Sequence, residues 1–334
     1  MNRVRMLLGR LSGKRVPLSL VLALAALVLA LARPTLPVTR EVYRHIVVVD
    51  ITQSMNVQDY QVEGRPVSRL EQVKRALRET LPELPCGSEV GLAIFSEHRA
   101  FLLFAPMEIC ANFSAILPTI DRLEWRMAWV GNSEVSKGLY EGLRVARQFG
   151  PQTNLVFITD GHEAPPVNPR YRPVFHGTPG EVAGVIVGVG GPTPVPIPKY
   201  DLSGRFVGYW SRDEVPQTDP YRRGRGGSVA GESMVGLEDV APVPEWNTGN
   251  EHLSSLREGY LKQLAQETGL HYRRLSVPKD LAAALRQPQF VREVRAEAEV
   301  GWVFGAFALA CLIAAHVLPL RRARGYRFPK SGGQ

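Results

Sequence analysis

Three oxygen-bearing side chains follow one strongly apolar segment of this sequence at alternate positions. The segment His45-Ile46-Val47-Val48-Val49 leads into Asp50, and Thr52 and Ser54 come directly after it. Alternate residues of an extended chain point the same way, so these three side chains can face one point. A second apolar segment ends on Asp160, which is followed by a glycine. These four residues are therefore candidate ligands of one cation.

Carboxylates and hydroxyls are hard oxygen donors, which favour Mg²⁺, Mn²⁺ or Ca²⁺ over a soft metal. Magnesium keeps several of its waters and takes few protein ligands, so such a site can leave one coordination position open. The expected chemistry is therefore metal-dependent binding of an oxygen ligand from another molecule.

Strands and helices alternate along the middle of the chain. The run that ends at Asp50 is apolar without alternation, which is typical of a strand buried on both faces of a parallel sheet. Ser68 and Glu71 form a capping-box pair at the start of a helix. The order predicts an α/β fold with a doubly wound, mostly parallel sheet, in which ligands bind at the carboxyl ends of the strands. Further strands are expected at 90–95, 100–104, 154–158, 182–189 and 270–275, and helices at 68–81, 110–122, 134–148, 256–267 and 279–286.

One long segment, 191–250, interrupts this alternation. It is rich in proline and glycine, and a loop of this length in a compact domain is usually functional or disordered. Its early part, from Pro196 to Tyr209, is compatible with a small β-hairpin. Trp210 and Trp246 lie in the same insertion and are candidates for an aromatic contact surface.

Two apolar runs lie at 16–33 and 299–320. A helix that crosses a bilayer needs roughly 17–25 apolar residues, so both runs are predicted to be transmembrane helices. The basic start of the first run also fits a cleaved signal peptide. An uncleaved anchor is favoured because Arg33-Pro34 follows directly and the run is long for a signal. The predicted globular domain then spans 38–290.

Basic residues cluster outside both runs, and neither the tail 1–15 nor the tail 321–334 contains an acidic residue. Basic residues beside a membrane span stay in the cytoplasm, so both tails are expected inside and 34–298 outside. Without the ten tail charges, the 40 basic residues become 30 against 32 acidic ones. A nucleic-acid-binding face is therefore not expected. The ten are Arg3, Arg5, Arg10, Lys14, Arg15, Arg321, Arg322, Arg324, Arg327 and Lys330.

The chain contains three cysteines. Cys311 lies inside the second apolar run and is expected to be a packing residue. Cys86 and Cys110 lie in the exported domain, where thiols are usually oxidised, so a disulfide between them is a candidate. A redox or metal role is not favoured because neither has a CxxC partner.

The motif around Asp50 and Asp160 resembles the metal-ion-dependent adhesion site of the von Willebrand factor A domain. That site has a DxSxS motif, then a threonine, then a strand ending in Asp-Gly. Asp50, Thr52 and Ser54 match the first part, with threonine in place of the first serine. The later threonine is missing, and the family's loop-and-helix pattern places Ser133 there, with the preceding asparagine as the second possibility. The resemblance implies that Thr52, Ser54 and Ser133 touch the metal, while Asp50 and Asp160 act largely through water.

A narrower resemblance covers roughly residues 16–320. Ser54-Met55, Asp59 and Ser68-Arg69-Leu70-Glu71 resemble the bacterial membrane-anchored branch of the family. This branch includes the aerotolerance-operon (Bat-type) proteins, often found with MoxR-type ATPases. The segments 50–60 and Cys86-Gly87-Ser88 resemble the MxaL-type accessory proteins of methanol dehydrogenase. The resemblance implies a bacterial inner-membrane protein whose domain faces the periplasm.

These resemblances imply a binding protein and not an enzyme. The first hypothesis is a module whose metal accepts a carboxylate from a protein partner, and which assists maturation or metal insertion of a periplasmic quinoprotein (methanol) dehydrogenase. The alternative is a Bat-type factor that assists envelope complexes or stress tolerance with a MoxR-type ATPase. A metal-dependent hydrolase would need a general base beside the metal. His162 and Glu163 are near in sequence, but are expected to be a solvated loop pair.

Overall fold

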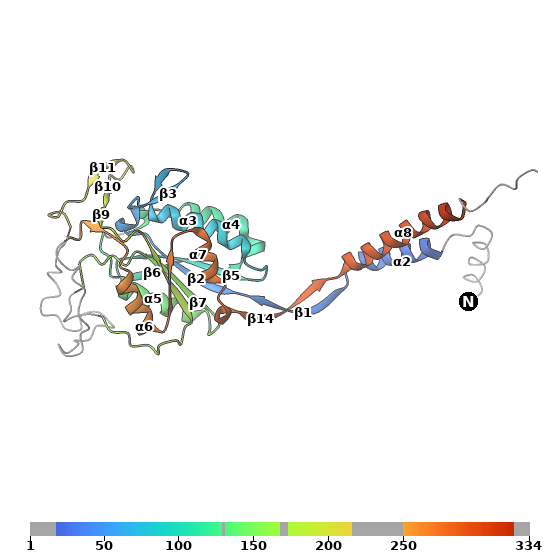
Figure 1. The fold of residues 1–334 in the computed structure, drawn as a ribbon. Helices are drawn as coiled ribbons and strands as arrows, with labels where there is room; N and C mark the ends of the chain where they lie inside the picture. Colours follow the sequence, from blue (N-terminus) through green and yellow to red (C-terminus); the bar gives the residue numbers. More distant parts are fainter. Residues whose placement is uncertain (1–17, 129–130, 168–172, 216–249, 324–334) are drawn as a thin grey trace, which may run out of the picture. The chain divides into compact units, whose positions relative to one another are not determined.

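The computed structural model describes residues 18–128, 131–167, 173–215 and 250–323 (Figure 1). Outside these ranges lie the predicted tail 1–15, most of the predicted tail 321–334, and part 216–249 of the insertion, with Trp246. The chain divides into two compact units. One is Glu41–Arg292, and the other is built from the segments that precede and follow it.

A six-stranded sheet forms the centre of the first unit. Its strands are β2 (Arg44–Asp50), β5 (Glu89–Ser96), β6 (Arg99–Glu108), β7 (Asn154–Thr159), β8 (Gly184–Val189) and β13 (His271–Leu275). They lie in the order β13-β8-β7-β2-β5-β6, and every neighbouring pair is parallel except β5 with β6. The strand order reverses between β2 and β7, which is the doubly wound arrangement. The predicted, mostly parallel α/β sheet is confirmed.

Helices cover both faces of this sheet (Figure 1). They are α3 (Arg69–Thr80), α4 (Ile109–Asp121), α5 (Val135–Gln148), α6 (Glu258–Thr268) and α7 (Pro278–Leu285). The middle of β2, from Ile46 to Val49, is apolar without alternation because it packs on both sides. Val47 and Val49 join the core beneath α3, α4 and α7, whereas Ile46 and Val48 join the core beneath α5 and α6.

Two local features position the helices beside the candidate site. The hydroxyl of Ser68 caps α3 by accepting a hydrogen bond from the backbone N of Glu71 at 3.1 Å, as the capping-box pair predicts. Helix α5 lies so close to β5 that a Cβ at Gly138 would meet the Phe95 ring at 2.1 Å. Glycine therefore allows α5, and the loop before it, to approach the sheet.

The described part of the insertion forms short strands. β10 (Pro198–Tyr200) and β11 (Phe206–Tyr209) are antiparallel, so the hairpin predicted within 196–209 is present. β9 (Val195–Pro196) pairs with β12 (Leu253–Ser254), which brings the two ends of the insertion together. The other short elements are the hairpin of β3 (Tyr60–Val62) and β4 (Arg65–Val67), and the 3-10 turns η1 (Gln53–Asn56), η2 (Leu81–Glu83), η3 (Trp125–Met127) and η6 (Pro288–Phe290).

The second unit contains helices from both apolar runs. α2 (Leu18–Leu31) and α8 (Gly301–Ala323) pack together around three alanines, and β1 (Thr35–Val42) pairs with β14 (Arg292–Glu299). Large apolar side chains are exposed on both helices, among them Leu24 and Trp302. Among the described residues, no helix combines the length and the apolar character needed to cross a membrane. The transmembrane helices at 16–33 and 299–320 stay predictions.

Candidate metal-binding site

Asp50 is the last residue of β2, at the point where the strand order of the sheet reverses. Its Oδ1 accepts hydrogen bonds from the backbone N of Thr52 at 2.9 Å and from Thr52 Oγ1 at 2.7 Å. Its Oδ2 accepts one from Thr159 Oγ1 at 2.6 Å. Thr52 Oγ1 lies 3.3 Å from Ser54 Oγ, and all these side chains are buried. Asp50, Thr52 and Ser54 thus form one cluster at the switch point, where doubly wound sheets bind ligands.

Asp160 follows β7 and is held in place by several donors. Its Oδ2 accepts hydrogen bonds from Arg69 Nη1 at 2.5 Å and from Ser254 Oγ at 3.0 Å. Its Oδ1 accepts one from the backbone N of His162 at 2.9 Å. The side chain of Ser54 also hydrogen-bonds Asp160. The structure therefore brings Asp160 to the cluster around Asp50.

Arg69, which holds Asp160, was not among the residues predicted for the site. Arg69 begins α3, and its side chain is fully buried. The guanidinium also binds Asp59, through Nε at 3.0 Å and Nη2 at 2.7 Å. A Cβ at Gly190 would meet Arg69 Nε at 2.7 Å, so only glycine leaves room for the guanidinium. Nothing local in the sequence pairs Arg69 with an aspartate 91 positions away.

The pKa values of the two aspartates are shifted in opposite directions. Burial, and after it the charge of Asp160, raises the pKa of Asp50 to about 7. Burial also disfavours the charge of Asp160, but the Arg69 guanidinium, His162 and the hydrogen bonds to the carboxylate together hold the pKa of Asp160 below its usual value. A cation beside Asp50 would offset the cost of burying its charge.

Ser133 lies in the loop before α5. Backbone hydrogen bonds run in both directions between Ser133 and Ala164, at 2.8 and 2.9 Å. Ser133 is 1% exposed, and its Oγ has no hydrogen-bond partner among the described residues. A buried hydroxyl without a partner is costly. A cation in the adjoining cavity would supply that partner.

A cavity of about 290 Å³ joins the hydroxyls to the insertion. Trp210 Nε1 donates a hydrogen bond to Gln53 Oε1 at 3.0 Å, which fixes the indole on the loop after Asp50. Trp210, one of the two aromatic candidates of the insertion, therefore lies at the candidate site. The residues that line the cavity include Thr52, Ser54, Ser133, His162, Trp210, Glu214 and Glu251.

His162 and Glu163 are buried, which corrects the expectation of a solvated loop pair. Glu163 accepts hydrogen bonds from Tyr260 Oη at 2.6 Å and from the backbone N of Ser136 at 3.2 Å, and so links α5 to α6. His162 lines the cavity, and burial lowers its pKa to about 4 against the opposing charge of Asp160. The expectation was wrong because these residues are covered by segments that lie far along the chain.

The donor set fits a hard divalent cation. Hydroxyl and carboxylate oxygens suit Mg²⁺, Mn²⁺ or Ca²⁺. Such a cation would offset the cost of the buried charge that raises the pKa of Asp50. It would also give the Ser133 hydroxyl the partner that it lacks among the described residues. Thr52, Ser54 and Ser133 would hold it, with Asp50 and Asp160 beside them.

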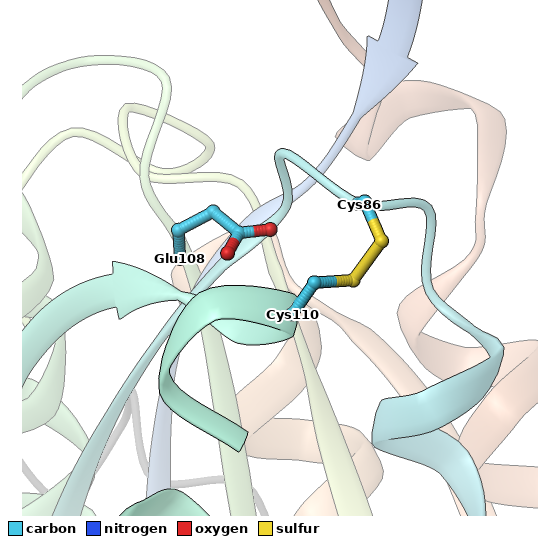
Figure 2. A group of neighbouring side chains, drawn as sticks. All are labelled: Cys86, Glu108 and Cys110. Carbon is cyan, nitrogen blue, oxygen red and sulfur yellow. A yellow bond between two sulfur atoms is a disulfide. The ribbon is translucent and has the colours of Figure 1, made fainter. Parts of the chain in front are cut away.

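A second cluster of potential metal-ligating residues consists of Cys86, Glu108 and Cys110 (Figure 2). The two cysteines form a disulfide, with 5.5 Å between their Cα atoms, so their sulfurs are not available to a metal. Glu108 accepts hydrogen bonds from the backbone N of Gly87 at 2.7 Å and of Ala111 at 2.5 Å. This cluster therefore caps α4 and joins it to the loop after η2.

The fold and the donor set define an α/β domain with a candidate divalent-cation site at the carboxyl edge of its sheet. Residues 45–162 match the family described as the von Willebrand factor type A domain. The chain therefore contains a von Willebrand factor type A domain, as its sequence resemblance predicted. The matched segment includes all five proposed ligands. A comparison with curated proteins gives no match.

Several solved structures resemble the chain distantly. An aerotolerance-related membrane protein from Bacteroides fragilis, with multiple mutations to serines, is 17% identical with a TM-score of 0.45; the match covers 73% of this chain and 97% of that one. An uncharacterised membrane-spanning protein from Vibrio fischeri is 19% identical with a TM-score of 0.27, covering 72% and 95%. A von Willebrand factor type A protein from Catenulispora acidiphila is 14% identical with a TM-score of 0.37, covering 75% and 43%. At this distance the likenesses carry no argument about function.

Proposed function

We propose that this chain is a membrane-anchored module that binds a protein partner through a divalent cation. Domains of its family are often metal-dependent protein-binding modules. The observation that carries the proposal is one cavity lined by Thr52, Ser54 and Ser133, beside the buried Asp50 and Asp160. When bound, Mg²⁺ (or Mn²⁺ or Ca²⁺) supplies a coordination position for a carboxylate of the partner.

Calorimetric titration of Mg²⁺ into the unit Glu41–Arg292, at about pH 8 so that Asp50 is ionised, tests the metal site. Asp50→Asn keeps the shape of the side chain but removes its charge, and should abolish Mg²⁺ binding. The variant should fold because burial already disfavours the charge of Asp50. Asp121→Asn is the matched control, since Asp121 is exposed and paired with Arg78, and it should bind like the unchanged protein. Equal Mg²⁺ binding by Asp50→Asn would contradict the proposed site.

The proposed membrane anchor is the pair of helices α2 and α8. Their exposed apolar side chains, such as Leu24 and Trp302, are expected to contact lipid. The basic tails predict cytoplasmic termini and a periplasmic domain at a bacterial inner membrane. Protease added to spheroplasts should therefore degrade the domain. Complete protection of the domain would contradict this orientation.

Two cellular roles fit such a module, and they differ in the partner. Assembly of envelope complexes or stress tolerance with a MoxR-type ATPase is supported by the resemblance to the Bat-type branch. Maturation of a periplasmic methanol (quinoprotein) dehydrogenase is supported by the resemblance of residues 50–60 to MxaL-type proteins. The calcium content of the dehydrogenase from a strain lacking this chain separates the two. Loss of calcium supports maturation, whereas an unaffected dehydrogenase favours the envelope role.

A metal-dependent hydrolase is the second candidate function, because His162 lines the same cavity as the proposed ligands. With its pKa lowered to about 4, His162 is neutral at physiological pH but is a weak base, because an efficient general base has a pKa near the operating pH. We propose binding and not catalysis. Turnover of phosphoesters by the purified protein, lost in Asp160→Asn, would reverse that proposal.

A further inference from the structure

The cavity at the candidate metal site contains one more buried carboxylate. Glu251 directly follows the insertion 191–250, just before β12, and lines the same cavity as Thr52, Ser54 and Ser133. Its side chain is 3% exposed, and its Oε2 lies 3.6 Å from His162 Nε2. A carboxylate buried in the same cavity as three hydroxyls is a suitable ligand for a hard divalent cation.

We propose that Glu251 is a further ligand of the cation, supplied by the segment that joins the insertion to β12. The inference rests on the proposed metal site and extends it. Glu251 takes the coordination position that is otherwise left for the carboxylate of a partner. A partner must therefore displace Glu251 before it can reach the metal.

The charge of Glu251 is costly to bury. Burial raises its pKa to about 7, and the guanidinium of Arg257 opposes that shift. Arg257 also interacts with the charge of Asp160, so it is shared between two carboxylates. A divalent cation in the cavity offsets the buried charges of Glu251 and Asp50 at the same time.

Contacts that do not involve a metal hold the insertion and the segment after it beside the cavity. Trp210 Nε1 donates a hydrogen bond to Gln53 Oε1 at 3.0 Å. Ser254, three residues after Glu251, donates a hydrogen bond through its Oγ to Asp160 Oδ2 at 3.0 Å. The segment that carries Glu251 is therefore attached directly to one of the proposed metal-site carboxylates.

Glu214 offers a matched control in the same cavity. Its carboxylate forms an ion pair with Lys199 and accepts a hydrogen bond from the backbone N of Ser211 at 3.1 Å. Replacing either glutamate with glutamine removes one negative charge from the cavity wall. A long-range electrostatic effect would follow from both changes, but it is weaker at Glu214, whose side chain is 40% exposed and paired with Lys199. Glu251→Asp, which keeps the charge, therefore separates loss of a ligand from loss of a charge.

Titration of the full-length protein in detergent with Mn²⁺, followed by electron paramagnetic resonance, tests this assignment. Binding removes the sharp spectrum of aqueous Mn²⁺, so the assay needs no partner and no activity. Glu251→Gln should bind Mn²⁺ at least about tenfold more weakly than the unchanged protein, because loss of even an outer-shell partner weakens metal binding about tenfold to a hundredfold. Glu214→Gln should bind equally well. Glu251→Asp keeps the charge but shortens the side chain, and should also bind more weakly. Thermal unfolding shows whether each variant is folded. If Glu251→Gln does not fold, the Mn²⁺ affinity of Glu251→Asp tests the inference in its place.

The possible outcomes separate this inference from the proposed metal site. Restoration of Mn²⁺ affinity in Glu251→Gln by sodium acetate supports the inference, because an added carboxylate then fills the vacated position. Equal affinity of Glu251→Gln and the unchanged protein overturns the inference but leaves the metal site. Equal losses in Glu251→Gln and Glu214→Gln also overturn it. Absence of Mn²⁺ binding, or binding that Asp50→Asn leaves unchanged, overturns the proposed function together with the inference.

Discussion

Replacing Arg69 with methionine tests the buried charge network behind the candidate site. The Arg69 side chain is 0% exposed, and its guanidinium binds Asp160 at 2.5 Å and Asp59 at 2.7 Å. Methionine fills much of the same volume but carries no charge or donor. The variant therefore keeps the carboxylates of Asp59 and Asp160 but removes the guanidinium that pairs with both of them.

The expected loss of stability follows from that burial. Removing one partner of a buried ion pair costs about 3–5 kcal/mol, because the remaining charge stays buried without compensation. Arg75→Met, on the same helix, is the matched control. Arg75 pairs with Glu79 at 2.8 Å, but the two side chains are 39% and 49% exposed. An exposed pair of this kind contributes about 0–1 kcal/mol.

Urea unfolding of the unit Glu41–Arg292, followed by circular dichroism, measures both losses. For a domain of this size the free energy of unfolding falls by about 2–3 kcal/mol per molar urea. Arg69→Met should therefore lower the midpoint by about 1–2 M, and Arg75→Met by less than about 0.5 M. If the two midpoints shift equally, the burial of Asp59 and Asp160 does not depend on the Arg69 guanidinium, and the reasoning is refuted.

Two further predictions concern the core beneath the site. Burial lowers the pKa of His45 from 6.5 to about 4 in the folded protein. As the pH falls from about 6.5 towards 4, His45 is therefore protonated in the unfolded chain before it is protonated in the folded one. The stability that is present above about pH 6.5 is lost over this range. Between about pH 7.5 and pH 5 the expected loss of stability is about 2 kcal/mol. Urea unfolding at both pH values should show a smaller loss for His45→Gln. An equal loss in the two proteins would contradict the lowered pKa of His45. Gly138→Ala should destabilise the unit by about 1–3 kcal/mol, because the new Cβ meets the Phe95 ring. Gly259→Ala on α6, with nothing within 4 Å of its Cβ, should be neutral or stabilising, and equal melting temperatures of the two variants would contradict the close packing of α5.

The proximity of Asp50, Thr52, Ser54 and Asp160 was predictable because its signal is local. Asp50 ends one apolar strand, Thr52 and Ser54 come just after it, and Asp160 directly follows another strand. Once the sheet is expected to be parallel, the carboxyl ends of its strands must share one edge. Ser133 has no such local signal, and only the family resemblance pointed to it.

The ribbon of β1 and β14 was not predicted, although part of its signal was present. In β14, Val294, Ala296 and Ala298 alternate with charged residues, which is the period of a strand. The partner strand lies at the opposite end of the sequence, so no turn between them marks a hairpin.

The charges that complete the site could not be predicted, because each depends on a partner from a distant element. Arg69 reads as an ordinary surface charge at the start of a helix, yet it binds Asp160 after β7 and Ser254 in β12. Ser254 and Asp160 are themselves hydrogen-bonded, so the three groups form a closed set. A change in the charge of Asp160 must therefore alter its hydrogen bond with Ser254, which positions β12 and the preceding Glu251. The charges of Arg69 and Asp160 therefore hold the candidate ligands and the segment 251–254 together, so neither can be understood from its own segment of sequence.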